Sequence, residues 1–349
     1  MPVRVGLIGV GAWARVLARA AKGSEKLAIV RALGRSPERA AAFSRETGIP
    51  LSDSLERMLG EPRLDAVLLV VPNALHLPFA KAAAEAGKHV FIEKPVANTL
   101  QDGLAIIDLE KTHNVRIAVG HCARLLAGNR LLRRMVDEGV LGRVTQIEAT
   151  FSNDRALRLS PRDWRWYRAS APGGSLSQIA IHQFDTLRYL GGEIAAVSAS
   201  AARHSPVGAE VEDQWIVAVH FKDGKLGSVV SNWTSPGSYH VRVTGEAALA
   251  FYEIDQSRWS KPETLHEGAT LSLEPRGAGP GGRQFIPVPP GNMVREELEL
   301  FADAILSGAP SELSATNGCE ALAAVYAAIK SAENRGVAVP LAEMRGSGG

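Results

Sequence analysis

Five short apolar runs, rich in β-branched residues, recur over the first 120 residues, with alanine-rich segments between them. Runs of this kind suit strands that are buried on both faces of a parallel sheet. We expect strands at Arg4–Gly9, Leu27–Leu33, Ala66–Val71, His89–Ile92 and Arg116–Val119. We expect helices at Trp13–Ala21, Pro37–Thr47, Leu77–Ala86 and Leu100–Lys111. The alternation predicts right-handed βαβ units and a doubly wound α/β sheet.

The pattern changes beyond Gly120. After a helix at Leu125–Glu138 come longer, partly alternating runs: Val144–Ser152, Val211–Phe221, Leu226–Asn232 and His240–Thr244. Such runs are typical of an α+β domain. Helical periodicity returns at Val294–Leu306 and Cys319–Ala332. We therefore expect two domains, residues 1–121 and 122–349, the second built on a large, mostly antiparallel open sheet and ending in a frayed tail.

Composition excludes several classes of function. The 39 Lys and Arg residues nearly balance the 37 Asp and Glu residues without any basic stripe of the kind that nucleic-acid binders carry. The longest apolar run, Ala66–Pro72, falls far short of the ~20 residues of a membrane span, and we see no signal peptide. Two cysteines fit a reducing compartment, and the nine histidines show no zinc-site spacing. We expect a cytoplasmic protein with no metal and no nucleic-acid or membrane partner.

The stretch VGLIGVGAWA carries the G-x-G-x-x-G/A spacing directly after a strand and before a helix. In that context Gly9 makes the tight turn, Gly11 lets the backbone approach a pyrophosphate, and Ala14 packs the helix on the strand. We therefore expect residues 1–121 to be a Rossmann domain that binds a dinucleotide. The loop residues expected to contact it are Gly9, Gly11, Ala12 and Trp13. The alternative is an ordinary structural turn.

The end of the second strand normally carries an acid that holds the adenosine ribose 2′-hydroxyl, about 20 residues after the glycine loop. Here the stretch ALGRSPERA has no acid before Glu38 and offers Arg35 and Ser36 instead. Without the acid a 2′-phosphate is not repelled, and a guanidinium and a hydroxyl can bind it. The sequence therefore favours NADP(H) over NAD(H), which stays open as a cofactor. The alternative is that Arg35 is a solvated loop residue.

Several longer motifs point to one family. The stretch VPNALHLPFAKAAAEAGKHVFIEKPVANTL, with GHCARL, GVLGRV, GGSLSQIAIHQFDTLRYLGG and ELELFADAIL, resembles the Gfo/Idh/MocA oxidoreductases, the relatives of glucose-fructose oxidoreductase and inositol dehydrogenase. The resemblance runs through almost the whole chain. It implies an NAD(P)-dependent enzyme that moves a hydride between nicotinamide C4 and a secondary alcohol or ketone.

The resemblance assigns roles around the E-K-P element. In the family its lysine lies beside the nicotinamide and hydrogen-bonds the reacting hydroxyl, which implies this role for Lys94. An ammonium there stabilises the oxygen as charge develops. Glu93 is placed toward the nicotinamide or its ribose, and a cofactor-lining loop contains Pro72, Asn73 and His76. The alternatives are a surface ion pair between Glu93 and Lys94, and helix capping by Asn73 or His76.

The segment GGSLSQIAIHQFD supplies the second half of the expected site. If it is helical, Gln178, His182 and Asp185 share one face. The family usually has Asp, His and Asp here, which implies that His182 is the acid/base. Gln178 departs from that pattern, and as an amide it can only orient substrate through hydrogen bonds. A branch that handles dihydroxylated rings and phthalate-type acids also carries glutamine at this place. The alternative for His182 is a core histidine, and we expect Asp185 to pair or cap within the fold.

Two further positions are candidates for substrate binding. Arg124 follows the last strand of the first domain, where relatives place substrate contacts, but it can equally pair with an acid. Trp164 begins the cluster Trp164–Tyr167, which either walls the pocket and binds a substrate carboxylate or packs at the domain interface. Cys122 shows no base or metal partner in the sequence, and we expect it in the core.

We therefore expect a dehydrogenase or reductase acting on a sugar, a cyclic polyol or a dihydroxylated ring acid. Lys94 would polarise the reacting oxygen and His182 would handle its proton, with residues 122–349 forming a substrate-binding and oligomerisation domain. A homodimer or homotetramer through the C-terminal sheet is expected from the family. The alternative from another class is a dinucleotide- or ligand-sensing protein without turnover, since a fold alone never proves activity. A hydrolase would need a nucleophile elbow or metal motif, which the sequence lacks.

Overall fold

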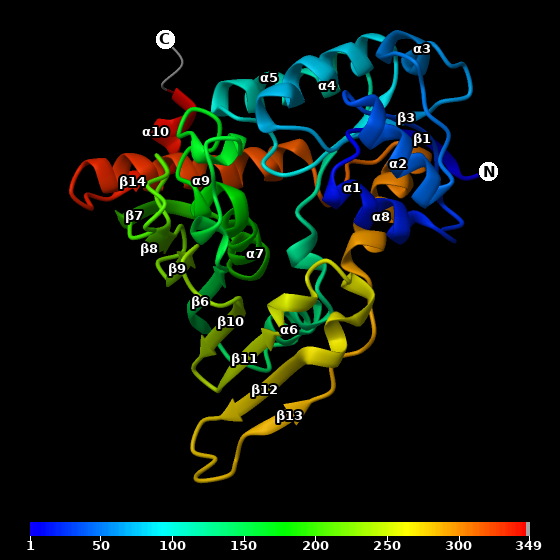
Figure 1. Cartoon of the computed structure of the whole chain (residues 1–349). Helices are drawn as coiled ribbons and strands as arrows, with labels where there is room; N and C mark the ends of the chain where they lie inside the picture. Colours follow the sequence, from blue (N-terminus) through cyan, green and yellow to red (C-terminus); the bar gives the residue numbers. More distant parts are fainter. Residues whose placement is uncertain (347–349) are drawn as a thin grey trace. The chain divides into compact units, whose positions relative to one another are not determined.

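The computed structural model describes residues 1–346, which fold into two compact units. The first unit contains Met1–Cys122 together with Val294–Cys319, and the second contains Ala123–Met293 and the residues from Glu320 onward. In Figure 1 the first unit therefore joins the blue and cyan part of the chain to the orange helix α8. Of the expected frayed tail, residues 347–349 lie outside the described part.

The first unit is built on a parallel sheet with the strand order β2-β1-β3-β4-β5. Its strands are β1 (Val3–Ile8), β2 (Leu27–Leu33), β3 (Ala66–Leu69), β4 (His89–Ile92) and β5 (Ile117–Val119). All of β3 and β5 is buried, as expected of strands covered on both faces. The order changes direction between β1 and β3, so the predicted doubly wound sheet is confirmed.

The helices of the first unit connect these strands. They are α1 (Ala12–Ala21), α2 (Pro37–Thr47), α3 (Leu55–Leu59), α4 (His76–Glu85) and α5 (Leu100–Thr112). Because parallel connections are right-handed, the crossover from β1 to β2 places its helix on the face opposite to α4 and α5. Helix α2 begins with a capped turn, where the Ser36 side chain accepts a hydrogen bond from the backbone N–H of Arg39 and Pro37 takes the first position. Helix α3 was not predicted.

The segment Val294–Cys319 belongs to the first unit. The predicted division into residues 1–121 and 122–349 therefore needs correction. Helix α8 (Met293–Ser307) carries Phe301, whose ring lies 5.8 Å from that of Phe91 on β4. The Arg295 side chain donates hydrogen bonds to the carbonyls of Ala20 and Lys22 at the end of α1. The apolar face of α8 is buried there, which gives the physical reason for the return.

The second unit is built on a sheet with the order β13-β12-β11-β10-β6-β9-β8-β7-β14. Its strands are β6 (Val144–Ser152), β7 (Ile194–Ala202), β8 (Gln214–Phe221), β9 (Leu226–Asn232), β10 (Ser238–Gly245), β11 (Ala248–Ile254), β12 (Ala269–Pro275), β13 (Gln284–Ile286) and β14 (Val339–Pro340). β6 pairs with β9 in parallel, and the other neighbours are antiparallel. The expected large, mostly antiparallel sheet is therefore confirmed.

Helices pack on one face of this sheet. They are α6 (Ala127–Asp137), α7 (Ile181–Gly191), most of α9 (Ala315–Glu333) and the short α10 (Leu341–Gly346). The Ser331 hydroxyl on α9 accepts a hydrogen bond from the backbone N–H of Ala199 on β7. Burial alternates along β8, where Trp215 and Val217 are buried and Ile216 is exposed, so the sheet keeps an open face. Within residues 1–346 no helix is both long and apolar enough to cross a membrane.

Candidate active site

The glycine loop of the first unit has the geometry of an anion-binding turn. Gly9 has φ +104°, and a Cβ there would lie 2.1 Å from the carbonyl oxygen of Val70, so only glycine fits. Gly11 precedes α1 with no side-chain cap, and no atom lies within 4 Å of where its Cβ would be. The first turn of α1 carries no acid, so its N–H groups and helix dipole favour a negative ligand. These residues fit a dinucleotide pyrophosphate, while Ala14 is buried as predicted.

The loop after β2 presents the residues expected to choose the cofactor. The side chain of Arg35 is exposed. The Ser36 oxygen already accepts the capping hydrogen bond from Arg39 at 3.4 Å, but its hydroxyl hydrogen can still donate to a phosphate. Glu38 lies in the first turn of α2. The arrangement fits a 2′-phosphate, and the cofactor preference stays a prediction.

The E-K-P element lies at the carboxyl end of β4. Glu93 is buried, and its carboxylate accepts hydrogen bonds from the indole Nε1 of Trp13 at 2.5 Å and from the backbone N–H of Lys94 at 3.2 Å. The Lys94–Pro95 peptide bond is cis. The alternative of a surface ion pair between Glu93 and Lys94 is therefore wrong, because Glu93 is buried and bonded to α1 through Trp13. The sequence had assigned Trp13 only to the cofactor.

Burial dominates the electrostatics of this element. It raises the pKa of Glu93 to about 7, although the Lys94 ammonium and the Trp13 indole both favour the ionised carboxylate. A second acid, Glu297 on α8, is also fully buried, and burial followed by the negative charge of Glu93 raises its pKa well above the ordinary value. Burial raises the pKa of the Cys122 thiol as well, with both glutamates adding to the effect. Cys122 is a core residue, as predicted.

Sequence reasoning missed Glu297, although the sequence holds a signal for it. Val294, Leu298 and Phe301 form the buried face of α8. Glu297 lies on that face and interrupts the apolar spacing with an acid. A charged residue in the buried stripe of a helix is rare unless it is paired or functional.

His76 joins two loops at the same edge of the sheet. It is fully buried, with Nδ1 3.0 Å from the carbonyl oxygen of Pro95 and Nε2 3.0 Å from that of Val71. The two carbonyls favour the protonated ring, but burial prevails and lowers its pKa to about 4. His76 therefore anchors the E-K-P turn to the loop after β3. For His76 the alternative of helix capping is wrong, because both ring nitrogens face these carbonyl oxygens. Pro72 is exposed in that loop and Asn73 is buried.

In the second unit a π-helical turn, Leu176–Ala180, leads directly into α7. Such turns are rare and are found frequently at functional sites. Gln178 lies in this turn and is buried, with its side-chain oxygen accepting a hydrogen bond from Nε of Arg165 at 3.1 Å. The guanidinium of Arg165 lies over the ring of Trp164, 4.0 Å from its centroid. Trp164 thus supports the arginine that contacts Gln178.

Arg165 forms no ion pair with a carboxylate among residues 1–346. The nearby carboxylate of Asp163 favours its charged form, but burial followed by the guanidinium of Arg155 prevails and lowers its pKa to about 10. Arg155 itself lines a cavity of about 320 Å³ with Asp163 and Gln256. The surroundings of Gln178 are therefore suited to an anionic group of a ligand.

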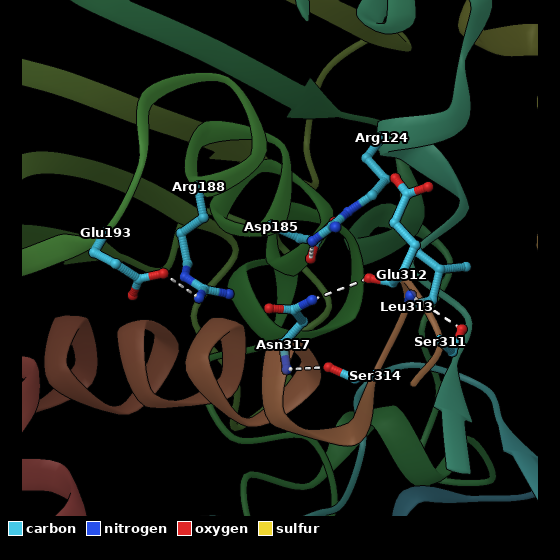
Figure 2. Close-up of polar contacts among 9 residues, drawn as sticks. All are labelled: Arg124, Asp185, Arg188, Glu193, Ser311, Glu312, Leu313, Ser314 and Asn317. Carbon is cyan, nitrogen blue, oxygen red and sulfur yellow. Dashed lines mark hydrogen bonds and ion pairs between the residues drawn. The ribbon is translucent and has the colours of Figure 1, made fainter. Parts of the chain in front are cut away.

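His182 is buried on α7, one turn after Gln178. Its ring packs against aromatic side chains, with centroid distances of 6.1 Å to Phe151 and 5.7 Å to Trp259. Asp185 accepts a hydrogen bond at 2.7 Å from Nε of Arg124 and a second one from its Nη2, as Figure 2 shows. The prediction that Asp185 pairs within the fold is confirmed. Arg124 pairs with an acid, the second of its two predicted alternatives.

The predicted site residues thus divide between the units. The first unit brings together the glycine loop, Trp13, the E-K-P element and His76. The second unit brings together Gln178, His182 and the Trp164–Arg165 pair. Among residues 1–346 no group of three or more His, Cys, Asp and Glu side chains is placed to bind a metal ion.

Comparison with known proteins finds matches in both parts of the chain. Residues 3–121 match the family model described as "Oxidoreductase family, NAD-binding Rossmann fold", and residues 129–259 match the "GFO/IDH/MocA C-terminal domain". A 1,5-anhydro-D-fructose reductase of Ensifer adhaerens is 30% identical over 340 residues, covering 94% of this chain and 96% of the relative.

Solved structures agree over the whole chain. A Desulfitobacterium hafniense protein described as an NADPH-dependent oxidoreductase superposes with a TM-score of 0.94 at 32% identity, covering 99% of both chains. A levoglucosan dehydrogenase in complex with NADH shares the fold with a TM-score of 0.86 at 24% identity, covering 98% of this chain and 99% of the other. The fold and its matches define the class of the protein, an NAD-binding oxidoreductase. More particularly, the chain belongs to the Gfo/Idh/MocA family.

Proposed function

We propose that this oxidoreductase transfers a hydride between C4 of the nicotinamide and a secondary alcohol or ketone carbon of a polyhydroxylated ring. The single observation that carries the proposal is the E-K-P element. It delivers Lys94 at the carboxyl end of a parallel strand, with Glu93 buried beneath it and bonded to the first helix after the glycine loop. Ligands of open α/β sheets bind at that edge.

Two residues divide the chemistry on oxygen. In the oxidative direction the hydroxyl proton passes to His182 and the carbinol hydrogen leaves as hydride, while Lys94 stabilises the oxygen as charge develops. When bound, the nicotinamide accepts or supplies that hydride. Gln178 orients a substrate hydroxyl or carbonyl by hydrogen bonding, as an amide can. Histidine is the side chain used most often as a general acid or base, which supports this role for His182.

The substrate class follows from the charge beside Gln178. The relatives named above act on 1,5-anhydro-D-fructose and on levoglucosan. Here Arg165 is half-buried and forms no ion pair with any carboxylate of residues 1–346, although Asp163 lies near enough to favour its charge. A sugar acid or dihydroxylated ring acid would supply a counterion, with its carboxylate at Arg165 and its hydroxyls toward Gln178 and His182.

Lys94→Ala tests the mechanism. We expect kcat to fall by about 10²- to 10³-fold, the usual cost of removing one donor that stabilises an oxyanion. Lys81→Ala, which removes an exposed lysine on α4, is the matched control and should leave kcat unchanged. The measurement is nicotinamide absorbance over a panel of sugars, polyols and ring acids. Turnover of Lys94→Ala within a few-fold of the parent protein would show that the mechanism is wrong.

A titration followed by tryptophan fluorescence tests the cofactor. Because Arg35 is exposed next to the Ser36 cap, we expect NADPH to bind more tightly than NADH. Arg35→Ala should weaken NADPH binding about tenfold or more and leave NADH binding within a few-fold, since only NADPH carries the 2′-phosphate. Arg39→Ala on the next turn is the control. Tighter binding of NADH would reverse the cofactor assignment, and binding of neither would favour a sensor without turnover.

The proposal includes self-association through the open face of the second unit's sheet. Large apolar side chains are exposed on three strands of this sheet: Ile216 (66%) on β8, Leu226 (53%) on β9 and Phe285 (73%) on β13. A homodimer or homotetramer would cover them. Light scattering of the parent protein and of Ile216→Glu would measure this directly. Two buried free cysteines suit the cytoplasmic location that the proposal also includes.

A further inference from the structure

Glu297 is a buried acid that the mechanism above does not use. Its side chain is fully inaccessible, and neither carboxyl oxygen has a hydrogen-bond partner among residues 1–346. An ionised carboxylate in that state would carry a large desolvation cost. A group of this kind persists in a protein when it is neutral or when a nearby charge compensates it.

The packing of α8 on β4 places Glu297 beside Glu93. Glu297 and Phe301 are four residues apart on the helix, so they lie on one face. Phe91 and Glu93 are two residues apart along the strand and its extension, so they point the same way. The rings of Phe301 and Phe91 lie 5.8 Å apart. Glu297 and Glu93 therefore lie on the facing sides of α8 and β4, next to this pair of rings.

The groups around Glu297 come from the ends of two strands. Glu93 and Lys94 lie at the end of β4, and the thiol of Cys122 follows β5. Trp13 from α1 already donates to one oxygen of Glu93. Lys94 is the cation of this set. Two ionised carboxylates sharing one cation in a buried site repel each other, and the usual outcome is that the pair retains one proton.

We propose that Glu93 and Glu297 form one titrating pair that holds a single negative charge opposite Lys94, with Glu297 carrying the proton. Trp13 and the backbone N–H of Lys94 stabilise the charge on Glu93, whereas no donor from residues 1–346 reaches the carboxyl oxygens of Glu297. Glu297 is thus a positioning residue that acts through Glu93 and Lys94. If Glu93 loses its charge, Glu297 becomes the sole acid facing Lys94, ionises and takes over that charge.

Infrared difference spectroscopy tests the proton directly and does not depend on the proposed function. We expect the parent protein at about pH 8, well above the ordinary pKa of glutamate, to show the carbonyl stretch of a protonated carboxylic acid. Glu297→Gln should lose that band. Glu299→Gln, on the same helix but bonded to Ser24, should keep it. Absence of the band from the parent protein would overturn the proposal even if every variant failed to fold.

A double-mutant cycle tests the shared charge and rests on the proposed function, since it reads kcat/KM. We expect Glu93→Gln alone to lower kcat/KM by about tenfold or less, because Glu297 ionises in its place. Glu93→Gln/Glu297→Gln should fall at least about tenfold below the product of the single effects, since no acid then faces Lys94. Effects that multiply independently would overturn the proposal. A parent protein without turnover would instead count against the proposed function and leave the infrared result standing.

The pH dependence of unfolding gives a further readout. An acid whose pKa is raised by folding binds more protons in the folded state, so stability falls as pH rises above the ordinary pKa. Both raised acids contribute in that sense. We expect the loss of stability between about pH 5 and pH 8 to be smaller in Glu297→Gln than in Glu299→Gln. Equal slopes in the two variants would contradict a proton held at Glu297.

Discussion

Two arginines of the second unit, Arg124 and Arg165, lie in opposite electrostatic situations. Arg124 is buried, only 5% exposed, and makes two hydrogen bonds to the equally buried carboxylate of Asp185. Arg165 is half-buried, lies over Trp164 and donates to the neutral amide of Gln178. The same side chain is thus neutralised within the fold in one place and left with an excess charge in the other.

The difference teaches how to separate a structural arginine from a binding one. A buried guanidinium needs a partner, and Asp185 supplies a carboxylate in the bidentate geometry that suits it. Arg165 has no such partner within residues 1–346, and its pKa, lowered to about 10 by burial and by Arg155, reflects the cost of that situation. Folding tolerates such a cost where a ligand compensates it. The two arginines should therefore respond differently to substitution.

The largest expected effect is on the buried pair. Asp185→Asn leaves Arg124 buried with an uncompensated charge, and we expect the free energy of unfolding to fall by about 3–5 kcal/mol. Urea denaturation followed by circular dichroism would measure it. The double variant Arg124→Met/Asp185→Leu removes both charges and should recover most of the loss. If Asp185→Asn is as stable as the parent protein, the pair is not what holds Arg124 in place.

The second effect is on Arg165 and should appear in binding. Arg165→Gln removes a charge that an acidic substrate would use, so we expect KM for such a substrate to rise by about 10- to 100-fold, the equivalent of one charge-assisted hydrogen bond. The free energy of unfolding should stay within about 0.5 kcal/mol. Arg162→Gln, nearby and exposed, is the control for a general loss of positive charge.

Two outcomes would break the comparison at this point. A KM that rises equally for neutral and acidic substrates would assign Arg165 to the orientation of Gln178 alone. A loss of stability as large as that of Asp185→Asn would place it with Arg124 as a structural residue.

The sequence predicted the parallel sheet well because its strands are buried on both faces and read as unbroken apolar runs. It missed β7 (Ile194–Ala202), whose stretch IAAVSASAA is mostly alanine and serine. That strand is held by its pairing with β8 and by the contact of Ser331 to its backbone. Both are tertiary contacts, which local strand propensity does not predict. The return of α8 to the first unit was missed for the same reason.

The candidate site was predictable where a motif fixed it. Gly9 and Gly11 stand in the spacing that a dinucleotide-binding turn requires, and Lys94 stands in the E-K-P element through which the chain resembles its family. The contacts around these motifs were not predictable, because the partner residues come from elsewhere in the chain. Trp13, which bonds to Glu93, lies 80 residues before it. His76 contacts two backbone carbonyls, and no sequence pattern reveals such contacts. The counterion of Arg124 was equally hidden, since Asp185 lies 61 residues away.

The smallest expected effect on stability is that of breaking an exposed ion pair. Glu274 and Arg283 form an ion pair at 2.9 Å between β12 and the turn before β13, and both side chains are about half exposed. Water and salt screen such a pair, so Glu274→Gln should change the free energy of unfolding by no more than about 0.5 kcal/mol. The same urea denaturation, repeated at low and high salt, would measure it. A loss of unfolding free energy approaching that of Asp185→Asn would mean that burial does not explain why the Arg124–Asp185 pair matters more than an exposed pair. Hydrogen-bond geometry alone would then have to explain the difference.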